Sequence, residues 1–488
     1  MNNKRNSVLW GIILISLALI LGGVLTAYPQ ASLAFFPTPA ADEINSNSIY
    51  PAADKMELVS QIGGELKKFV INGNYVYIAE GARLTILDIS NPLTPTVMGR
   101  SPVMGELIQD VAVSADGNWA YLAVGSLGIQ VVDCSVKTQP IFKGNYSWGA
   151  EANQVVAVSS DYLYAVDSSN TKIWVINIQN PNSPYAVGSS ALLNHSIIRL
   201  KVSSPYAYAV TEGNTFLTFD INGSNITQPS LINTLNLSTL TNPLTQGKDF
   251  AIDASTTPSV AYVVGLEGLR KIDLSTYTQM GFYTPTGIQM ESVFVDPSES
   301  LIFIGAENYG LQVMNTTLSL MGTFTAVPPY QVTQVSKAGR YAYVKDRTIG
   351  LRIISIPLTW ISTPRTLNQA SLYHLFPAKD VAIQQSNAYI ASQRAGMNVV
   401  SVANESAPSY VANYGTLGTA MGVKVQSSTV YLTTFNTLAS GGLERINVAN
   451  PAFPTIIGAP IVIAGNSVSN VDVEGNYAYT AASTEGLQ

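Results

Sequence analysis

The chain has 488 residues, of which 47% are hydrophobic and only 11% are charged, and its formal net charge is −6. Soluble proteins usually carry about 25% charged residues, so neutral polar side chains must supply much of the hydrated surface here. The acidic balance and the lack of a dense Lys/Arg cluster argue against a nucleic-acid partner, and the single cysteine, Cys134, excludes an internal disulfide.

Residues 1–27 have the features of an export segment. Lys4 and Arg5 precede an uncharged apolar run of 18 residues, Val8–Leu25. A helix needs roughly 17–25 apolar residues to span a bilayer, so the run is either a cleaved signal peptide or a retained N-terminal transmembrane anchor. The positive residues before the run predict export of the remaining chain. We therefore expect a protein that is anchored at the outer side of the cytoplasmic membrane, or secreted to the cell surface.

Residues 28–56 predict a stalk. Pro29, Pro37, Pro39 and Pro51 stand among Ala, Ser and Asn, and no apolar period is present. Such a segment is typical of a flexible to semi-rigid linker. It would hold the remaining domain, residues 57–488, away from the membrane.

From residue 57 onward one unit of four short strands recurs. In one such unit, Val111–Val113 is followed by a polar turn, by Ala120–Val124, by Ile129–Asp133 and by a weaker strand that ends near Gly144. An aromatic residue in the second strand marks each unit. These positions are Tyr77, Tyr121, Tyr164, Tyr208, Tyr262, Phe303, Tyr343, Tyr389, Tyr431 and Tyr479. A spacing of about 40–45 residues with four strands per unit is typical of β-propeller blades.

The composition of the strands supports the same fold class. Runs such as Tyr162–Val166 are almost continuously apolar, as expected for a blade that is covered on both faces by its neighbours. We predict an all-β fold, a β-propeller of about ten four-stranded antiparallel blades behind the N-terminal helix. Leu58–Gly63 is predicted to be a leading fourth strand that completes the last blade. The last unit stops inside a strand, so we expect a truncated chain. A ring of seven or eight blades followed by the start of another is an alternative, and we expect an extended rim loop between Ile232 and Lys248.

The third strand carries a family resemblance. It reads Leu84-Thr85-Ile86-Leu87-Asp88 in the first unit, and Asn91-Pro92-Leu93-Thr94-Pro95 follows. The same Asn-Pro-x-x-Pro pattern recurs at Asn180–Pro184 and Asn450–Pro454, whereas units five to seven lack it. The chain resembles the LVIVD-repeat proteins, a family of bacterial and archaeal cell-surface propellers. The resemblance implies an exported propeller with a role in adhesion or interaction, and it transfers no catalytic residues.

The acidic residue that ends each third strand is interpreted as a turn residue. Equivalent positions read Asp88, Asp133, Asn177, Asp220, Asp273, Asn315, Ser355, Ser401 and Asn447. A catalytic carboxylate does not tolerate Asn or Ser, whereas a side chain that accepts a backbone N–H does. Asp116-Gly117-Asn118 is likewise predicted to be a hairpin turn and not a calcium loop, because the further acidic ligands are missing. With two histidines and one cysteine, we expect no metal and no cofactor.

The mouth of the central channel is the remaining candidate surface. If the first strand of each unit is innermost, the residue before its apolar run faces the channel. The charged and polar members of this set are Lys68, Asp110, Arg199, Asp249, Asp380 and Asn470. The equivalent positions in the other units are taken as Val155, Ser292, Val332 and Gly422. Exposed aromatics such as Trp148 and Trp360 are alternative contact residues, although core packing is the simpler interpretation of each.

These patterns predict a non-enzymatic protein that binds a protein or a cell-surface polysaccharide. No nucleophile elbow or phosphate-binding loop is present in the sequence. One alternative is an extracytoplasmic hydrolase or lyase that acts at the channel mouth through Asp110, Asp249 or Asp380. Another alternative is a structural repeat protein of the cell envelope. The fold alone does not choose among these three.

Overall fold

The computed structural model describes most of the chain after residue 64. The described ranges are 65–157, 159–167, 169, 171–325, 331–347, 350–357, 365–366, 368–374, 377–404, 408–416, 418–435, 441–463, 468–482 and 486–488. The predicted export segment, the stalk, the leading strand at 58–63 and Trp360 lie outside these ranges. Within the described ranges, no helix is both long enough and apolar enough to cross a membrane.

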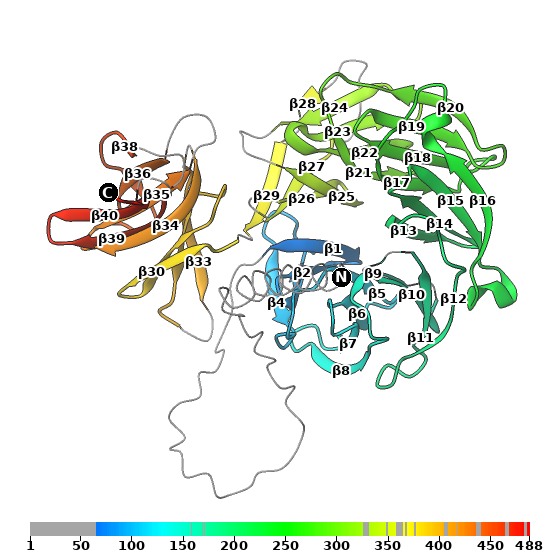
Figure 1. Ribbon diagram of the computed structural model, residues 1–488, viewed down its shortest axis with the longest axis horizontal. Helices are drawn as coiled ribbons and strands as arrows, with labels where there is room; N and C mark the ends of the chain where they lie inside the picture. The colour runs from blue at the N-terminus through cyan, green and yellow to red at the C-terminus, as the bar shows by residue number, and fades with distance from the viewer. Residues whose placement is uncertain are drawn as a thin grey trace, which may run out of the picture. The chain divides into compact units, whose positions relative to one another are not determined.

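Seven antiparallel sheets follow one another from residue 66 to residue 374 (Figure 1). Sheet 1 contains β1 (Leu66–Asn72), β2 (Tyr75–Glu80), β3 (Arg83–Asp88) and β4 (Thr96–Arg100). Sheet 2 contains β5 (Asp110–Val113), β6 (Trp119–Ala123), β7 (Ile129–Asp133) and β8 (Ile141–Tyr146). Sheet 3 contains β9 (Ala152–Ala157), β10 (Tyr162–Asp167), β11 (Ile173–Asn177) and β12 (Tyr185–Ser189). Sheet 4 contains β13 (Ile197–Ser203), β14 (Tyr206–Thr211), β15 (Thr215–Asp220) and β16 (Ser230–Asn236).

The next three sheets repeat this order with small departures. Sheet 5 contains β17 (Gly247–Asp253), β18 (Val260–Gly265), β19 (Gly268–Asp273) and β20 (Thr278–Tyr283). Sheet 6 contains β21 (Met290–Asp296), β22 (Leu301–Ala306), β23 (Gly310–Asn315) and β24 (Leu320–Phe324), and β28 (Arg365–Thr366) adds a fifth, parallel strand. Sheet 7 contains β25 (Val332–Ala338), β26 (Tyr341–Asp346), β27 (Gly350–Ser355) and β29 (Asn368–His374). Three short 3-10 helices lie between strands: η1 (Gly223–Ile226), η2 (Leu237–Thr239) and η3 (Glu307–Tyr309).

The seven sheets close into a β-propeller-like ring. Figure 1 shows the first strand of each sheet nearest the centre and the fourth strand at the rim. Six apolar clusters join consecutive sheets, and a seventh joins sheet 7 back to sheet 1. In that closing cluster Tyr343 and Ile353 pack with Phe69. Burial of apolar faces, at roughly 25 cal/mol per Å², therefore acts at every sheet-to-sheet boundary of the ring. Among the described residues, the ring closes because a face of sheet 7 packs on a face of sheet 1.

The recurring aromatic residue explains how neighbouring sheets hold together. All ten aromatic positions occupy the third residue of a second strand, as the sequence predicted. Tyr77 is fully buried, and its hydroxyl donates to the carbonyl of Gly117 in sheet 2 at 2.6 Å. Tyr164 donates to the carbonyl of Ile226 in sheet 4 at 2.8 Å. The ring packs against the next sheet while its hydroxyl satisfies a carbonyl there, which matches the preference of buried tyrosine.

The segment between Ile232 and Lys248 is packed, which corrects the expectation of an extended rim loop. Leu237 and Leu244 are completely buried between sheets 4 and 5. The Arg270 guanidinium donates to the carbonyls of Asn242 and Pro243, at 2.6 Å in each case. The insertion is thus held by burial and by charge-assisted hydrogen bonds, a combination that its Asn/Ser/Thr-rich sequence did not reveal.

The remaining three sheets form a second array. Sheet 8 contains β30 (Asp380–Gln384), β31 (Asn387–Ala391), β32 (Met397–Ser401) and β33 (Ser409–Tyr414). Sheet 9 contains β34 (Thr419–Gln426), β35 (Thr429–Phe435) and β36 (Gly441–Asn447), whose outer edge pairs with β37 (Thr455–Ile456) and β38 (Ile461–Ile463). Sheet 10 contains β39 (Val468–Glu474), β40 (Tyr477–Ala482) and β41 (Gly486–Leu487). Apolar clusters join sheet 8 to sheet 9 and sheet 9 to sheet 10. The arrangement agrees with the alternative of a seven-sheet ring followed by further units.

Candidate functional site: a polar pocket on the axis of the ring

A repeated irregularity sets the position of the candidate residues. The register of the innermost strand skips one residue near its start, as between Leu66 and Lys68 and between Ile197 and Arg199. The residue after the skip is followed by an apolar residue that is buried between sheets, such as Phe69 or Leu200. A bulge of this kind re-aims the polar residue while the apolar residue keeps its place in the core.

Four of the six predicted residues, Lys68, Arg199, Asp249 and Asn470, occupy this position. Asp110 and Asp380 are instead the first residues of β5 and β30, where the register shows no skip. Lys68, Asp110, Arg199 and Asp249 belong to the ring, whereas Asp380 and Asn470 belong to the second array. The alignment by sequence was wrong in two sheets. The bulge position is held by Gln154 in sheet 3 and by Gln334 in sheet 7, and not by Val155 and Val332. The four-residue pattern apolar, any, polar, apolar is shared by Leu66–Phe69 and Val332–Val335, and it could have located Gln334.

The three aspartates of the predicted set each fasten one sheet to a neighbouring sheet. One Asp110 oxygen accepts the N–H of Val111, and the other accepts the N–H of Val155 in sheet 3 at 3.2 Å. Asp249 accepts the N–H of Val293 in sheet 6 at 3.1 Å. In the second array, Asp380 accepts the N–H of Val423 at 2.9 Å. Carboxylates that are engaged in this way stabilise the inner wall by charge-assisted hydrogen bonds.

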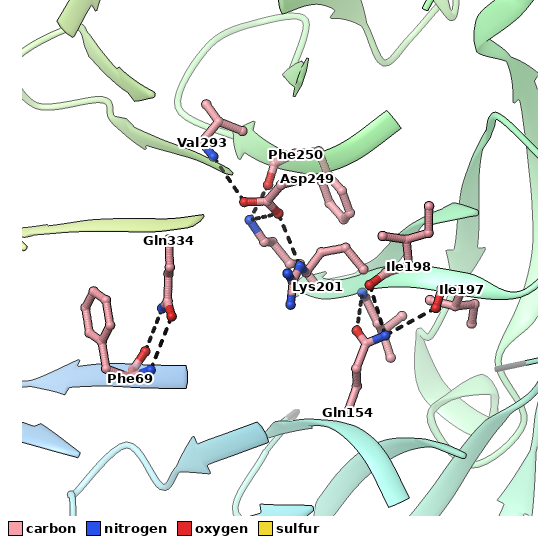
Figure 2. A network of polar contacts seen from close by, with 11 residues as sticks. Phe69, Gln154, Ile197, Ile198, Lys201, Asp249, Phe250, Val293 and Gln334 are labelled. Atoms are coloured by element: carbon pink, nitrogen blue, oxygen red, sulfur yellow. Dashed lines mark hydrogen bonds and ion pairs between the residues drawn. The ribbon is translucent and has the colours of Figure 1, made fainter. Parts of the chain in front are cut away.

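The two glutamines make the same connection with both ends of their amides. Gln154 Oε1 accepts the N–H of Leu200 at 3.2 Å, and its Nε2 donates to the carbonyls of Ile197 and Ile198. Gln334 Oε1 accepts the N–H of Phe69 at 3.2 Å, and its Nε2 donates to the carbonyl of Phe69 at 2.7 Å. Figure 2 shows both amides reaching across to the neighbouring strand. The Gln334 contact joins sheet 7 to sheet 1, and thus closes the ring on its polar side.

An ion pair replaces this connection between sheets 4 and 5. Lys201 Nζ lies 2.7 Å from Asp249 Oδ1, and Arg199 Nε lies 3.6 Å from the same oxygen. Lys201 also donates to the carbonyl of Phe250 (Figure 2). Burial alone would raise the pKa of Asp249, but the two positive charges more than offset it, so this pKa lies below its ordinary value. Asp249 is therefore an ionised, paired carboxylate.

The innermost strands of the three sheets of the second array line a pocket of about 410 Å³, and those of five sheets of the ring line a smaller pocket of about 320 Å³. This axial pocket, of 320 Å³, is lined by Lys67, Lys68, Gln109, Asp110, Asn153, Gln154, Ile197, Ile198, Arg199, Glu212, Thr333, Gln334 and Lys345. It brings together Lys68, Asp110 and Arg199 of the predicted set. Asp380 and Asn470 instead line the 410 Å³ pocket of the second array, beside Lys424 and Asp472.

Two lysines in the axial pocket carry unusual pKa values. Removal from bulk water, with repulsion from Arg199 next in importance, lowers the pKa of Lys68 to about 8. Burial, with repulsion from Arg347 and Lys68, lowers the pKa of Lys345 to about 7. Lys345 donates a single hydrogen bond, to the carbonyl of Lys67 at 2.7 Å. Among the described residues neither lysine has a carboxylate within ion-pair distance, so no neighbouring acid offsets the cost of burying their charge.

The acidic residues at the ends of the third strands are turn residues, as predicted. Asp88 accepts the N–H of Ser90 at 2.7 Å, and Asn315 accepts the N–H of Thr317 at 3.1 Å. The same contact with the residue two positions ahead recurs at Asp133, Asn177, Asp220, Asp273, Ser401 and Asn447. Asp116 accepts the N–H of Asn118 around Gly117, whose φ of +70° suits glycine in a hairpin turn. In the part of the chain that the structure describes, no group of three or more His, Cys, Asp or Glu could hold a metal ion.

Trp148 is a packing residue. Its ring lies 6.0 Å from that of Trp174 and 6.0 Å from that of Tyr146, and all three pack against the cluster between sheets 2 and 3. This placement agrees with the simpler of the two interpretations of Trp148.

Four-stranded sheets around an axis, joined by apolar clusters and by inner-strand hydrogen bonds, define a β-propeller-like repeat protein. The LVIVD repeat model matches six segments, at residues 63–101, 108–147, 152–191, 198–236, 377–416 and 465–488. The chain therefore carries LVIVD repeats, as its third strands indicated. The matches omit units five to seven, which lack the Asn-Pro-x-x-Pro pattern, and they also omit unit nine, which has it at Asn450–Pro454. No curated protein matches the chain.

Proposed function

We propose that the protein is a non-enzymatic, extracytoplasmic binding protein that takes a unit of a cell-surface polysaccharide into the axial pocket. The observation that carries the proposal is the convergence of polar side chains from five sheets on one small cavity. Its volume of 320 Å³ lies at the lower end of the range for small-ligand sites, about 300–1,000 Å³. The lining amides of Gln109 and Asn153 offer both donors and acceptors, as sugar hydroxyls require.

A protein partner fits this cavity less well. The cores of protein–protein interfaces are enriched in aromatic residues and depleted of charge. The axial pocket is lined by amide and charged side chains, and its lining includes no aromatic residue. A sugar unit suits a concave polar cavity better than the face of a folded protein does.

The contacts of the three predicted aspartates support binding rather than catalysis. Paired catalytic carboxyls cooperate at separations of about 5–9.5 Å, and they must be available to the substrate. Asp110 and Asp249 each accept a backbone N–H from the next sheet, and Asp249 is also paired with Lys201. Asp380 belongs to the second array. These engagements favour a structural role over that of a hydrolase or lyase.

The proposed location rests on the N-terminal sequence. Lys4 and Arg5 before the apolar run Val8–Leu25 support export, with the run either cleaved or kept as a membrane anchor. The stalk at residues 28–56 would then present the ring outside the cell. Fractionation of cells that produce the full chain tests this. Recovery of the protein in the cytoplasm would contradict the location without bearing on the pocket.

The binding test uses the full-length protein and three polymers: alginate, polyphosphate and neutral dextran. Asn153→Trp fills the axial pocket, and Ser160→Trp is its matched control, in the hairpin that follows the other end of the same strand. We expect the wild-type protein and Ser160→Trp to bind at least one of the polymers. The affinity of Asn153→Trp for that polymer should be at least tenfold lower. The length of the polymer should not change during the experiment. Binding that survives Asn153→Trp, or retention of a protein partner alone, would contradict the proposal. Polymer cleavage would support the enzyme alternative, and lattice formation by the purified protein would support the structural one.

A further inference from the structure

Basic side chains outnumber acidic ones around the axial pocket. Its lining contributes four basic side chains, Lys67, Lys68, Arg199 and Lys345, against two acidic ones, Asp110 and Glu212, which leaves an excess of two positive charges. The whole chain has the opposite balance, with a formal net charge of −6. A cavity with one dominant sign of charge concentrates ligands of the other sign.

Three of the four nearby carboxylates are already engaged. Asp110 accepts two backbone N–H groups, and Asp249 is paired with Lys201 at 2.7 Å. Lys67 is paired with Glu65 at 2.9 Å. Glu212 is exposed, and it forms no ion pair among the described residues. Lys68 and Lys345 are therefore left without an acid of their own.

The buried cation is the strongest single sign of a missing ligand. Lys345 is only 8% exposed, yet its ammonium has three donors and makes one hydrogen bond among the described residues, to the carbonyl of Lys67 at 2.7 Å. A buried ammonium without an anion is costly, and relief comes either by loss of the proton or by arrival of an anion. Lys68 on β1 of the neighbouring sheet and Arg199 on β13 line the same pocket and are placed to share such an anion.

We propose that the axial pocket is an anion site, which holds the carboxylate or phosphate of an acidic sugar unit between Lys68, Arg199 and Lys345. The inference rests on the proposed function, because it names the class of sugar that the pocket takes. The amides of Asn153 and Gln109 lie on the same lining and would contact the uncharged part of the unit. Carboxylate and phosphate share the chemistry that these cations recognise, and Arg199 suits either one.

The site predicts a dependence on pH. The charged groups that act on Lys68 and Lys345 are Glu65, Asp110, Arg199, Lys201, Asp249 and Arg347. Burial also lowers the pKa of Lys201, which is paired with Asp249, whereas Lys68 and Lys345 have no ion pair among the described residues. Both lysines are increasingly neutral as the pH rises through about 7 and about 8. Affinity for an anion should therefore fall as the pH rises.

The test is calorimetric titration of the full-length protein with three small probes: glucuronate, inorganic phosphate and glucose. We expect glucuronate or phosphate to bind and glucose to bind at least tenfold more weakly. Tighter binding of glucuronate would assign the natural source to a uronic acid, and tighter binding of phosphate would assign it to a phosphate-bearing polymer. Between pH 6 and pH 9 we expect the affinity for glucuronate to fall at least tenfold.

Variants separate a specific site from general charge. Lys68→Met and Lys345→Met should each weaken binding of the preferred anion about tenfold, whereas Lys143→Met should leave it unchanged. Lys143 is the matched control because it lies on the outer strand β8, paired with Asp133 at 3.7 Å. Equal loss in the control, or full binding in both pocket variants, would overturn the anion site. Binding of neutral dextran that Asn153→Trp abolishes, with no preference for anions, would overturn the anion site and leave the proposed function standing. No binding by any probe or polymer would overturn both.

Discussion

The side-chain amide of Gln334 makes two hydrogen bonds with the backbone of Phe69, which lies 265 positions away in the sequence. The amide oxygen accepts the N–H of Phe69 at 3.2 Å, and the amide nitrogen donates to its carbonyl at 2.7 Å. Gln154 makes the corresponding contact between sheets 3 and 4. A glutamine at the same strand position thus joins sheets 3 and 4 inside the ring and joins sheets 7 and 1 where the ring closes. The boundary between sheets 7 and 1 is therefore built in the same way as a boundary inside the ring.

Gln334→Met should destabilise the ring. The substitution preserves apolar bulk but removes an acceptor and a donor, which leaves a backbone N–H and a carbonyl near the axis without their partner. We expect a loss of about 1–3 kcal/mol in the free energy of unfolding, measured by urea denaturation. Gln154→Met should cost a similar amount, because its contacts are equivalent. Gln109→Met is the control: its amide makes only a 3.4 Å contact with the carbonyl of Leu107, so we expect a change below about 0.5 kcal/mol. No difference among the three variants would refute the role of the amides.

The tyrosine hydroxyls provide a second test of the contacts between sheets. Tyr77→Phe removes the 2.6 Å hydrogen bond to Gly117 and should cost about 1–2 kcal/mol. Tyr121 is the matched control, because it holds the same place in sheet 2 and no contact of its hydroxyl with a described residue falls within hydrogen-bond distance. Tyr121→Phe should therefore leave the midpoint of denaturation unchanged. Equal effects of the two substitutions would show that the hydroxyl contact contributes nothing.

If Asp88 is a turn residue, its replacement by Asn should be tolerated and its replacement by Ala should not. Asp88→Asn keeps an oxygen that accepts the N–H of Ser90, so thermal stability should change little at neutral pH. Asp88→Ala removes the acceptor and should cost about 0.5–1.5 kcal/mol. The hydrogen bonds from Ser90 lower the pKa of Asp88, so its contribution is present above the unfolded pKa and is lost as the pH falls through the folded one. Thermal unfolding of both variants at pH 7 and at pH 3 checks this. A loss with Asn as large as with Ala would contradict the turn interpretation.

Lys345 should make the ligand-free protein more stable as the pH rises. Its folded pKa of about 7 lies below its ordinary value of 10.5, so between these values the unfolded chain binds a proton that the folded chain does not. Stability therefore increases with pH in this window. We expect the melting temperature to rise between about pH 6.5 and pH 8.5, and Lys345→Met to flatten the rise. A wild-type melting temperature that falls over this range would contradict the buried, unpaired lysine.

Much of the fold was predictable because each unit repeats a local solution. Tyr77 and eight of its nine counterparts recur once per unit because each packs at the boundary between neighbouring sheets, whereas Tyr479 of the last sheet is 40% exposed. Asp88 was identified as a turn residue because Asn and Ser replace it elsewhere. The position at which the ring closes was not predictable, since the packing of Tyr343 and Ile353 on Phe69 leaves no local signal in either segment. The sequence contains ten similar units, and no residue pattern in it indicates that the seventh unit packs on the first.

The candidate site was predicted in part. Lys68, Asp110 and Arg199 were found from their place before an apolar run, and the structure brings them to one pocket. Gln154 and Gln334 were missed because Val155 and Val332 were taken as the aligned residues. Lys345 was missed for a different reason. It lies near the end of the second strand, inside a run that is otherwise buried, and only the register Gln334 to Lys345 places it beside the axis.

The most direct test of the axial anion site is the proton count on binding. An anion beside Lys68 and Lys345 stabilises their charged forms, so each lysine that is partly neutral in the free protein takes up a proton. Titration of the full-length protein with glucuronate at pH 8, in two buffers of different ionisation enthalpy, measures this uptake. We predict a net uptake of protons that is reduced in Lys345→Met. Binding with no uptake, or with release of protons, would contradict the site.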